Sequence, residues 1–201
     1  MKNVAKKVCP DSRLGGWLSI LDGGYIIYII IRYLKPKIVV ETGVGPGGTS
    51  SVILKALSDN HKGILYSIDL PGFDSIFYPT IGKNYNIHIP DGFDVGWLIP
   101  PWLKTRHILI LGDSKLKLPE LLEQLRDNNK KVDIFLHDSL HTDEHISFEF
   151  STIFPHLNKD AILLCDDVNE HWSTEFIRIC KKNNLPFIIF RNRLGISIWK
   201  Q

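Results

Sequence analysis

Short apolar runs alternate with longer mixed stretches from position 36 to the end of the chain. The runs are nearly continuous in apolar residues, which is typical of strands in a parallel sheet covered on both faces. We expect five such strands, at residues 38–42, 63–70, 107–113, 132–138 and 161–167. The stretches between them have helical spacing and few breakers. We expect helices at residues 48–60, 116–129, 142–157 and 169–184.

This alternation predicts a doubly wound α/β fold, and the length favours one domain over residues 1–201. The end of the chain breaks the rhythm. Two further apolar runs, at 185–190 and 195–200, are separated only by RNRL. Such a connection is too short for a helical crossover, so we expect a C-terminal antiparallel hairpin.

Two segments lie outside the regular pattern. Residues 12–34 read as a helix that ends before Pro36, so residues 1–35 would form an N-terminal helical extension. Its Trp17, Tyr25 and Tyr28 would suit the interface of a homo-oligomer.

The segment 71–106 is rich in proline, glycine and aromatic residues. A connection this long is typical of a lid or substrate-binding insertion. The alternative is a structural excursion that packs on the edge of the sheet.

Composition narrows the class of protein. The 24 Lys and Arg residues against 22 Asp and Glu give a net charge of +2, too little for a nucleic-acid-binding surface. The three cysteines have no CxxC spacing, which fits a reducing compartment. The most apolar run, residues 25–34, is too short to cross a membrane, and the start of the chain lacks the apolar core of a signal peptide. We therefore expect a soluble, cytoplasmic protein.

The stretch VVETGVGPGGTS, residues 39–50, follows the first strand and opens a helix. Gly43, Gly45 and Gly48 match GxGxxG, and Gly47 belongs to the same turn. Glycines let backbone N–H groups approach a ligand closely, and a helix N-terminus adds unpaired donors. No Gly-Lys-Ser/Thr follows, which excludes a Walker phosphate loop. A dinucleotide and an adenosyl ligand with a cationic amino-acid tail both remain possible.

Acids at the ends of the first three strands help to choose between these ligands. Glu41 would attract an ammonium group and repel a pyrophosphate, while Asp69 would accept from ribose hydroxyls. Asp113 and Ser114, in LGDS, would meet the adenine end of the ligand. A single such acid is often only a turn former or helix cap. Three in register favour a ligand crevice at the carboxyl edge of the sheet.

A second group of polar residues follows the fourth and fifth strands. Asp138 follows the fourth strand, and Asp166 and Asp167 follow the fifth. Carboxylates brought together repel unless they are neutralised, and oxygen ligands select Mg²⁺, Mn²⁺ or Ca²⁺. We expect a metal there, with Asp138 and His141 as catalytic residues and His141 as the base that takes a hydroxyl proton. The alternative is that Asp138 and Ser139 merely cap a helix.

Two other histidines accompany His141 in LHDSLHTDEH. His137 belongs to the strand and His145 to the following helix, so the three histidines do not lie along one face of a single helix. We expect structural or surface roles for His137 and His145, and no zinc site, because HxxxH lacks a third ligand.

These motifs also carry a resemblance. ETGVGPGGTS, SIDL, GDS and the terminal hairpin, in that order, resemble class I S-adenosylmethionine-dependent methyltransferases over roughly residues 36–200. More narrowly, HDSLHTDEHISFEF with LLCDDV resembles a branch that includes cephalosporin-hydroxylase-like members and metal-dependent macrolide-sugar O-methyltransferases.

The resemblance implies a seven-stranded sheet of order 3-2-1-4-5-7-6. It implies a methyl-donor pocket lined by Glu41, Gly43, Gly45, Asp69 and Asp113. It also implies metal-binding acids after the fourth and fifth strands and a base histidine in the intervening loop. Catechol-type relatives have Asp-Asn at the second acid site and macrolide-sugar types Glu-Asp, whereas this chain has Asp-Asp.

The function expected from all of this is S-adenosylmethionine-dependent methyl transfer to a hydroxyl of a small molecule, such as a sugar, with possible Mg²⁺ or Mn²⁺ assistance. The alternatives are an NAD-dependent Rossmann-type enzyme and a non-catalytic relative that binds an adenosyl ligand. No nucleic-acid or membrane partner is expected.

Overall fold

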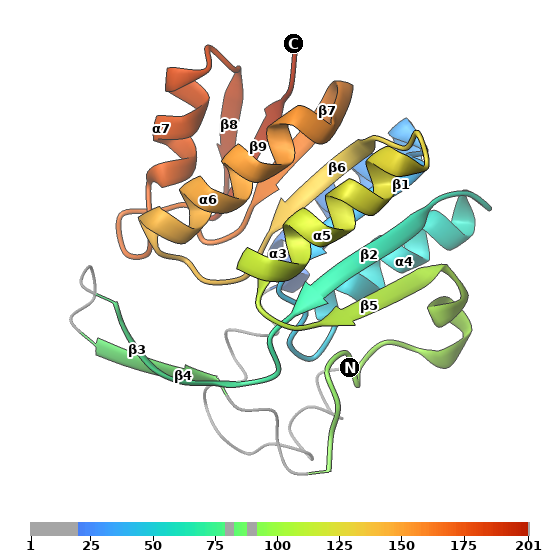
Figure 1. Cartoon of the computed structure of the whole chain (residues 1–201), viewed down its shortest axis with the longest axis horizontal. Helices are drawn as coiled ribbons and strands as arrows, with labels where there is room; N and C mark the ends of the chain where they lie inside the picture. Colours follow the sequence, from blue (N-terminus) through green and yellow to red (C-terminus); the bar gives the residue numbers. More distant parts are fainter. Residues whose placement is uncertain (1–19, 79–82, 88–91, 201) are drawn as a thin grey trace.

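The computed structural model describes residues 20–78, 83–87 and 92–200 of the chain. Seven strands form one sheet (Figure 1). In order across the sheet they are β5 (His107–Leu111), β2 (Ile64–Asp69), β1 (Ile38–Thr42), β6 (Val132–His137), β7 (Leu157–Cys165), β9 (Leu194–Ile198) and β8 (Phe187–Phe190). Pairing is parallel from β5 to β7 and antiparallel for β7 with β9 and β9 with β8. The expected strand order and the C-terminal hairpin are confirmed.

Helices cover both faces of this sheet. They are α3 (Ile20–Leu34), α4 (Gly48–Asp59), α5 (Ser114–Asp127), α6 (Asp143–Ile153) and α7 (Glu175–Lys182). In Figure 1, α5 and α6 lie in front of the sheet, and α3 and α4 lie behind it. The two layers enclose separate apolar clusters, one with side chains of α5, α6 and α7 and the other with side chains of α3 and α4.

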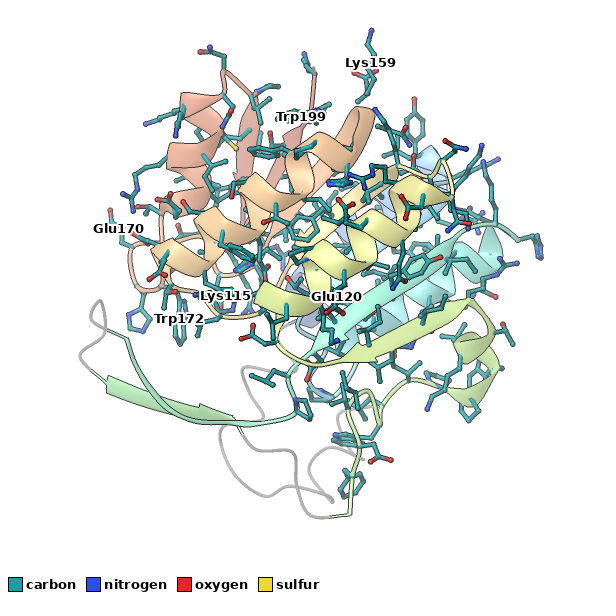
Figure 2. All side chains as sticks on the ribbon, in the orientation of Figure 1. Lys115, Glu120, Lys159, Glu170, Trp172 and Trp199 are labelled. Carbon is teal, nitrogen blue, oxygen red and sulfur yellow. The ribbon has the colours of Figure 1, made fainter. Side chains whose placement is uncertain are left out.

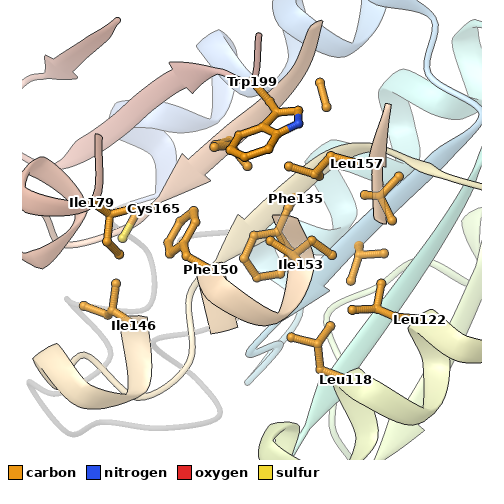
Figure 3. Packing of buried hydrophobic residues seen from close by; sticks show 14 of the residues in the cluster. Leu118, Leu122, Phe135, Ile146, Phe150, Ile153, Leu157, Cys165, Ile179 and Trp199 are labelled. Atoms are coloured by element: carbon orange, nitrogen blue, oxygen red, sulfur yellow. The ribbon is translucent and has the colours of Figure 1, made fainter. Parts of the chain in front are cut away.

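The central strand β1 shows why the apolar runs lack polar alternation. Val39 and Val40 are both fully buried, but they belong to opposite clusters because successive side chains of a strand point to opposite faces. On the α5–α7 side, the rings of Phe135 and Phe150 meet edge to face at 5.4 Å (Figure 3). Each fully buried ring contributes about 1.5–3 kcal/mol to stability.

The segment 71–106 is only partly a loop. Its β3 (Phe73–Tyr78) and β4 (Lys83–Ile87) pair antiparallel as a separate two-stranded sheet, which extends away from the main sheet (Figure 1). The segment 71–106 ends in a 3-10 helix, η1 (Pro101–Arg106). Val95 and Ile99 are buried in the cluster that α3 and α4 share. The C-terminal part of the segment is therefore packed against the domain.

The N-terminal helix is described from Ile20 onward, so Trp17 and the first part of the expected helix lie outside the described residues. Tyr28 donates from its hydroxyl to Asp59 of α4 (2.7 Å), whereas Tyr25 is half exposed. A role of this helix in a homo-oligomer stays a prediction. Among the helices that the structure describes, none is long and apolar enough to span a membrane.

Candidate active site

The glycine turn between β1 and α4 touches the loop that follows β6. Gly43 has a φ of +83°, and a Cβ atom there would lie 1.9 Å from the carbonyl oxygen of Asp138. Only glycine allows this backbone conformation and this approach. The turn and the acid-bearing loop are therefore direct neighbours.

Asp69, the last residue of β2, holds the turn from the other side. Its Oδ2 accepts from the backbone N–H of Val44 (2.6 Å) and of Gly45 (2.9 Å). Burial raises the pKa of Asp69, although these two bonds act in the opposite direction. Gly45 has a φ of +50°, and a Cβ there would meet nothing within 4 Å. The turn is thus fixed by Asp69 but leaves space next to Gly45.

Part of the segment 71–106 covers this turn. Gly96 N–H donates to the carbonyl of Gly45, and Leu98 N–H donates to that of Pro46, both at 2.8 Å. A Cβ on Gly47 would lie 2.5 Å from Cγ1 of Ile99, so Gly47 is needed for this packing. Sequence reasoning left the position of the segment open between a lid and the sheet edge, and this part of it lies on the glycine turn.

Glu41 lies beneath the turn, fully buried at the end of β1. Its Oε2 accepts from the hydroxyls of Ser50 (2.7 Å) and Ser67 (2.8 Å). Its Oε1 is also buried but has no hydrogen-bond partner among the described residues. Burial raises the pKa of Glu41 to about 7. A buried carboxylate oxygen without a donor is costly, and a ligand ammonium would satisfy it.

Asp113 and Ser114 have protein partners in the structure. Asp113 caps α5, where its Oδ1 accepts from Lys115 N–H at 2.8 Å. The buried Ser114 donates from its hydroxyl to Glu149 at 2.5 Å. Their predicted contacts with the donor ligand stay predictions.

Glu149 of α6 is the centre of a buried hydrogen-bond network that joins five parts of the fold. Its Oε2 accepts from Thr42 of β1 (2.6 Å) and from Nδ1 of His137 of β6 (2.7 Å). Its Oε1 accepts from Ser114 (2.5 Å), Ser139 (2.9 Å) and Nε2 of His145 (2.9 Å). Burial alone would raise the pKa of Glu149, but His137 and the other donors hold it well below its usual value. The expected structural roles of His137 and His145 agree with this geometry.

The three predicted metal-ligating acids are neighbours, but a guanidinium lies among them. Arg193, in the turn before β9, donates to Asp166 from Nε (2.9 Å to Oδ1) and from Nη2 (2.6 Å to Oδ2). The same Nη2 is 3.2 Å from Oδ1 of Asp167. Asp167 has a φ of 55°, a left-handed conformation that few non-glycine residues adopt.

The acids differ in their protonation. Burial and the neighbouring Asp166 and Asp167 raise the pKa of Asp138 well above its usual value. Burial and Asp166 raise that of Asp167 to about 6. For Asp166 the hydrogen bonds and charge of Arg193 outweigh burial, so its pKa is lowered. Arg193 thus neutralises Asp166 most effectively.

His141 lies between two of these carboxylates. Its Nε2 is 3.9 Å from Oδ1 of Asp138 and 3.8 Å from Oδ2 of Asp167, too long for direct hydrogen bonds. Burial, followed by the charge of His137, lowers the pKa of His141 to about 3, so its imidazole is neutral at pH 7. Asp138 does not cap the next helix: Thr142 does, accepting from His145 N–H at 3.3 Å.

Trp172 also borders His141, with ring centroids 6.0 Å apart. The helix expected over residues 169–184 in fact begins at Glu175. The side chain of Asn169 accepts from the N–H groups of His171 (2.9 Å) and Trp172 (3.1 Å), which stabilises a turn instead. Trp172 and Lys115 lie at the carboxyl end of the strands, opposite Lys159 and Trp199 (Figure 2).

The residues do not fit the predicted divalent ion. In the part of the chain that the structure describes, no group of three or more His, Cys, Asp or Glu side chains is arranged to hold a metal. Both oxygens of Asp166 accept hydrogen bonds from Arg193, which places a positive charge at the cluster. The metal set of Asp138, Asp166 and Asp167 is therefore not confirmed, because a cationic side chain occupies part of it.

Sequence reasoning missed Arg193, Glu149 and Trp172. The expected strand order offered a signal for Arg193, because it places the last strand beside the fifth, which the Asp-Asp pair follows, and Arg193 directly precedes that last strand. Glu149 could have been noticed as an acid on the apolar side of its helix, next to Phe150. We see no comparable signal for Trp172.

A protein-family model described as a methyltransferase domain matches residues 40–168, which include the glycine turn and all three acids. The chain belongs to this family. The resemblance to class I S-adenosylmethionine-dependent methyltransferases is thereby confirmed. A comparison of this chain with curated proteins found no match.

Solved structures share the fold of this methyltransferase domain. The calicheamicin methyltransferase CalS11 has a TM-score of 0.65 at 17% identity, over 89% of this chain and 78% of its own. The S-adenosylhomocysteine-bound methyltransferase PaMTH1 of Podospora anserina has a TM-score of 0.61 at 14% identity, over 89% and 78%. The O-methyltransferase TomG of Streptomyces achromogenes, in complex with S-adenosylmethionine, has a TM-score of 0.60 at 12% identity, over 89% and 80%.

Proposed function

We propose that the chain binds S-adenosylmethionine at the glycine turn and transfers its methyl group to a hydroxyl of a small molecule. The observation that carries this proposal is the contact of Gly43 with the backbone of Asp138. It makes a turn suited to the methyl donor adjacent to a histidine and acids suited to a hydroxylated acceptor.

Two acids and one glycine support donor binding. The unpartnered Oε1 of Glu41 is an acceptor for the ammonium of the amino-acid tail. The turn uses only Oδ2 of Asp69, so Oδ1 can accept from a ribose hydroxyl. The space next to Gly45 admits a ligand close to the backbone. PaMTH1 and TomG, which share this fold, were solved with S-adenosylhomocysteine and S-adenosylmethionine bound, and this supports a donor of the same class for this chain.

The gaps around His141 support hydroxyl binding. An oxygen atom about 2.8 Å from two polar atoms can bridge them when they are just under 4 Å apart, as Nε2 of His141 is from Asp138 and Asp167. The hydroxyl oxygen attacks the methyl carbon, the carbon–sulfur bond breaks, and its electrons remain on sulfur as S-adenosylhomocysteine forms. The hydroxyl proton passes to His141 or to Asp138, whose raised pKa makes it the stronger base.

Metal assistance is not included in this proposal. An ion at Asp138, Asp166 and Asp167 would compete with the guanidinium of Arg193, which donates to both oxygens of Asp166. Methyl transfer gains chiefly from positioning the two reactants, which the residues around the turn provide.

Calorimetry with S-adenosylhomocysteine tests donor binding. We expect the wild type to bind and Asp69→Asn to bind about 10- to 100-fold more weakly, because hydrogen bonds to a charged group are lost. Asp127→Asn, at an exposed position on α5, is the matched control and should bind as the wild type does. Absence of binding by the wild type, or tight binding of NADH in a fluorescence titration, would contradict the proposal.

The alanine variant of Gly45 tests where the donor lies. A methyl there meets no protein atom within 4 Å, so the fold should survive at a cost of about 1–2 kcal/mol for the left-handed backbone. We expect a loss of S-adenosylhomocysteine affinity out of proportion to that loss of stability. Unchanged affinity would show that the ligand does not contact Gly45.

A further inference from the structure

Among the described residues, Arg193 is the cationic side chain that pairs with the acid cluster. Arg193 forms two parallel hydrogen bonds with Asp166, and its Nη2 also reaches Asp167. Parallel N–H···O pairs of this kind are among the strongest side-chain interactions, since both charge and geometry match. The arginine and Asp166 are both less than one third exposed, so water screens them only partly.

The fold fixes this arginine in place. Arg191 and Asn192 both have positive φ angles near 50°, which turns the chain tightly before β9. The carbonyl of Arg193 accepts from Val168 N–H at 2.7 Å, just beyond the two acids. Gly195, two residues later, pairs with Cys165 at the end of β7. A Cβ on Gly195 would lie 2.5 Å from the ring of Phe176, so glycine is needed for β9 to pack this closely against α7.

This arrangement competes directly with a divalent cation. Mg²⁺ needs oxygen lone pairs that point at it in near-ideal octahedral geometry. A guanidinium already takes both oxygens of Asp166 and one of Asp167. An ion at the cluster would also lie close to the positive charge of Arg193.

We infer that Arg193 is the resident cation of the acceptor site, in the position of a divalent metal, and that methyl transfer by this chain is metal-independent. The inference rests on the proposed function for its chemical meaning. Arg193 is a positioning residue: it holds Oδ1 of Asp167, while Oδ2 of the same carboxylate is the oxygen 3.8 Å from His141. Through Asp167 it sets the gap in which the acceptor hydroxyl would lie.

Titration with Mn²⁺ alone, followed by electron paramagnetic resonance, tests the inference without any turnover. We expect weak binding by the chelator-treated wild type and binding about tenfold tighter, or more, by Arg193→Ala, because three carboxylates are then left without their cation. Arg193→Lys keeps the charge and should bind as weakly as the wild type. The matched control is Arg191→Ala, two residues away, whose guanidinium lies 5.6 Å from the ring centres of Tyr25 and Phe190.

Two results would overturn the inference. One is stoichiometric Mn²⁺ binding by the wild type that is lost in Asp166→Asn, a comparison that decides even if Arg193→Ala does not fold. The other is unchanged, weak binding by a folded Arg193→Ala, since the arginine would then not be what excludes the ion. Calorimetry with S-adenosylhomocysteine on the same samples separates the two proposals: a wild type that does not bind it refutes the proposed function, while the Mn²⁺ comparison still judges Arg193.

Discussion

Glu149 and the group of Asp138, Asp166 and Asp167 lie at the same edge of the sheet, but the pKa of Glu149 is shifted in the opposite direction from those of Asp138 and Asp167. Glu149 is one carboxylate with five donors, and its pKa is lowered. Asp138, Asp166 and Asp167 are three carboxylates that share one arginine, and the pKa values of Asp138 and Asp167 are raised. The first group is fully satisfied, and the second has acceptor capacity left over.

This difference separates framework from function. A carboxylate that the protein itself satisfies stabilises the fold, and Glu149 ties together the ends of β1 and β6 and the starts of α5 and α6. Acids whose charge is incompletely compensated cost stability and are typical of ligand-binding sites. The same comparison makes opposite predictions for substitutions in the two groups.

The largest effect is expected for Glu149→Ala. It leaves His137, Thr42 and other buried donors unpaired, and breaking a buried charged network typically costs about 3–5 kcal/mol. The folded pKa of Glu149 is lowered, so its contribution is fully present at pH 7 and is lost only as the pH falls below its unfolded value. Urea unfolding at pH 7 measures the change. Glu144→Ala, at a side chain that is 87% exposed, should change the free energy of unfolding by less than about 0.5 kcal/mol. Equal effects in the two variants would contradict the framework role of Glu149.

Asp138→Asn should have the reverse effect. We expect turnover to fall about 100-fold or more, because a proton acceptor is lost. The free energy of unfolding should rise at pH 7, because the raised pKa of Asp138 makes its ionisation unfavourable in the folded state. Since an acid with a raised pKa destabilises only above its unfolded pKa, the gain should vanish near pH 4. Urea unfolding at both pH values checks this, and a variant less stable than the wild type at pH 7 would refute it.

Donor binding should also depend on pH, with a change in affinity smaller than the loss of turnover expected for Asp138→Asn. Free Glu41 keeps its proton up to about pH 7, but an ammonium partner requires the carboxylate. S-adenosylhomocysteine should therefore bind about tenfold more tightly at pH 7 than at pH 5.5, with proton release visible as buffer-dependent heat in calorimetry. In Glu41→Gln this dependence should disappear. An identical pH dependence in the variant would assign the proton to another group.

The smallest effect is expected at the helix cap between the two groups. Thr142→Ala removes the side-chain acceptor for His145 N–H, which typically costs about 0.5–2 kcal/mol. Thr142→Ser keeps the oxygen and should recover most of that stability. Thermal unfolding of the two variants checks this, and equal losses would mean that the methyl group of Thr142, and not its hydroxyl, is what matters.

Most of the fold could be predicted because burial dictates it. The runs at β1, β6 and β7 are apolar since both faces of those strands are covered, and a two-faced parallel sheet admits few topologies. Boundaries were harder where side chains compete with the backbone. Asn169 replaces the first turn of an expected helix with its own hydrogen bonds, and no periodicity reveals that.

The positions of the acids could be predicted at both parts of the candidate site, but the partner of Asp166 and Asp167 could not. Glu41 and Gly43 follow the first expected strand and Asp69 ends the second, so the parallel-sheet pattern itself predicts that they meet at the turn, as Asp69 does with Val44 and Gly45. Arg193 meets Asp166 from 27 positions away, through strand pairing that is not visible in any local pattern. The sequence indicated that the acids needed a cation, but not that the protein supplies it.

The position of β9 also links completion of the sheet to the environment of the acids. This strand is the last of the sheet to be synthesised, yet it lies between β7 and β8 and not at an edge. Without it, β7 would have an open side, and Asp166 and Asp167 would lack the guanidinium of Arg193. Completion of the sheet and neutralisation of the acid cluster therefore depend on the same C-terminal segment, and a chain without it would lack both.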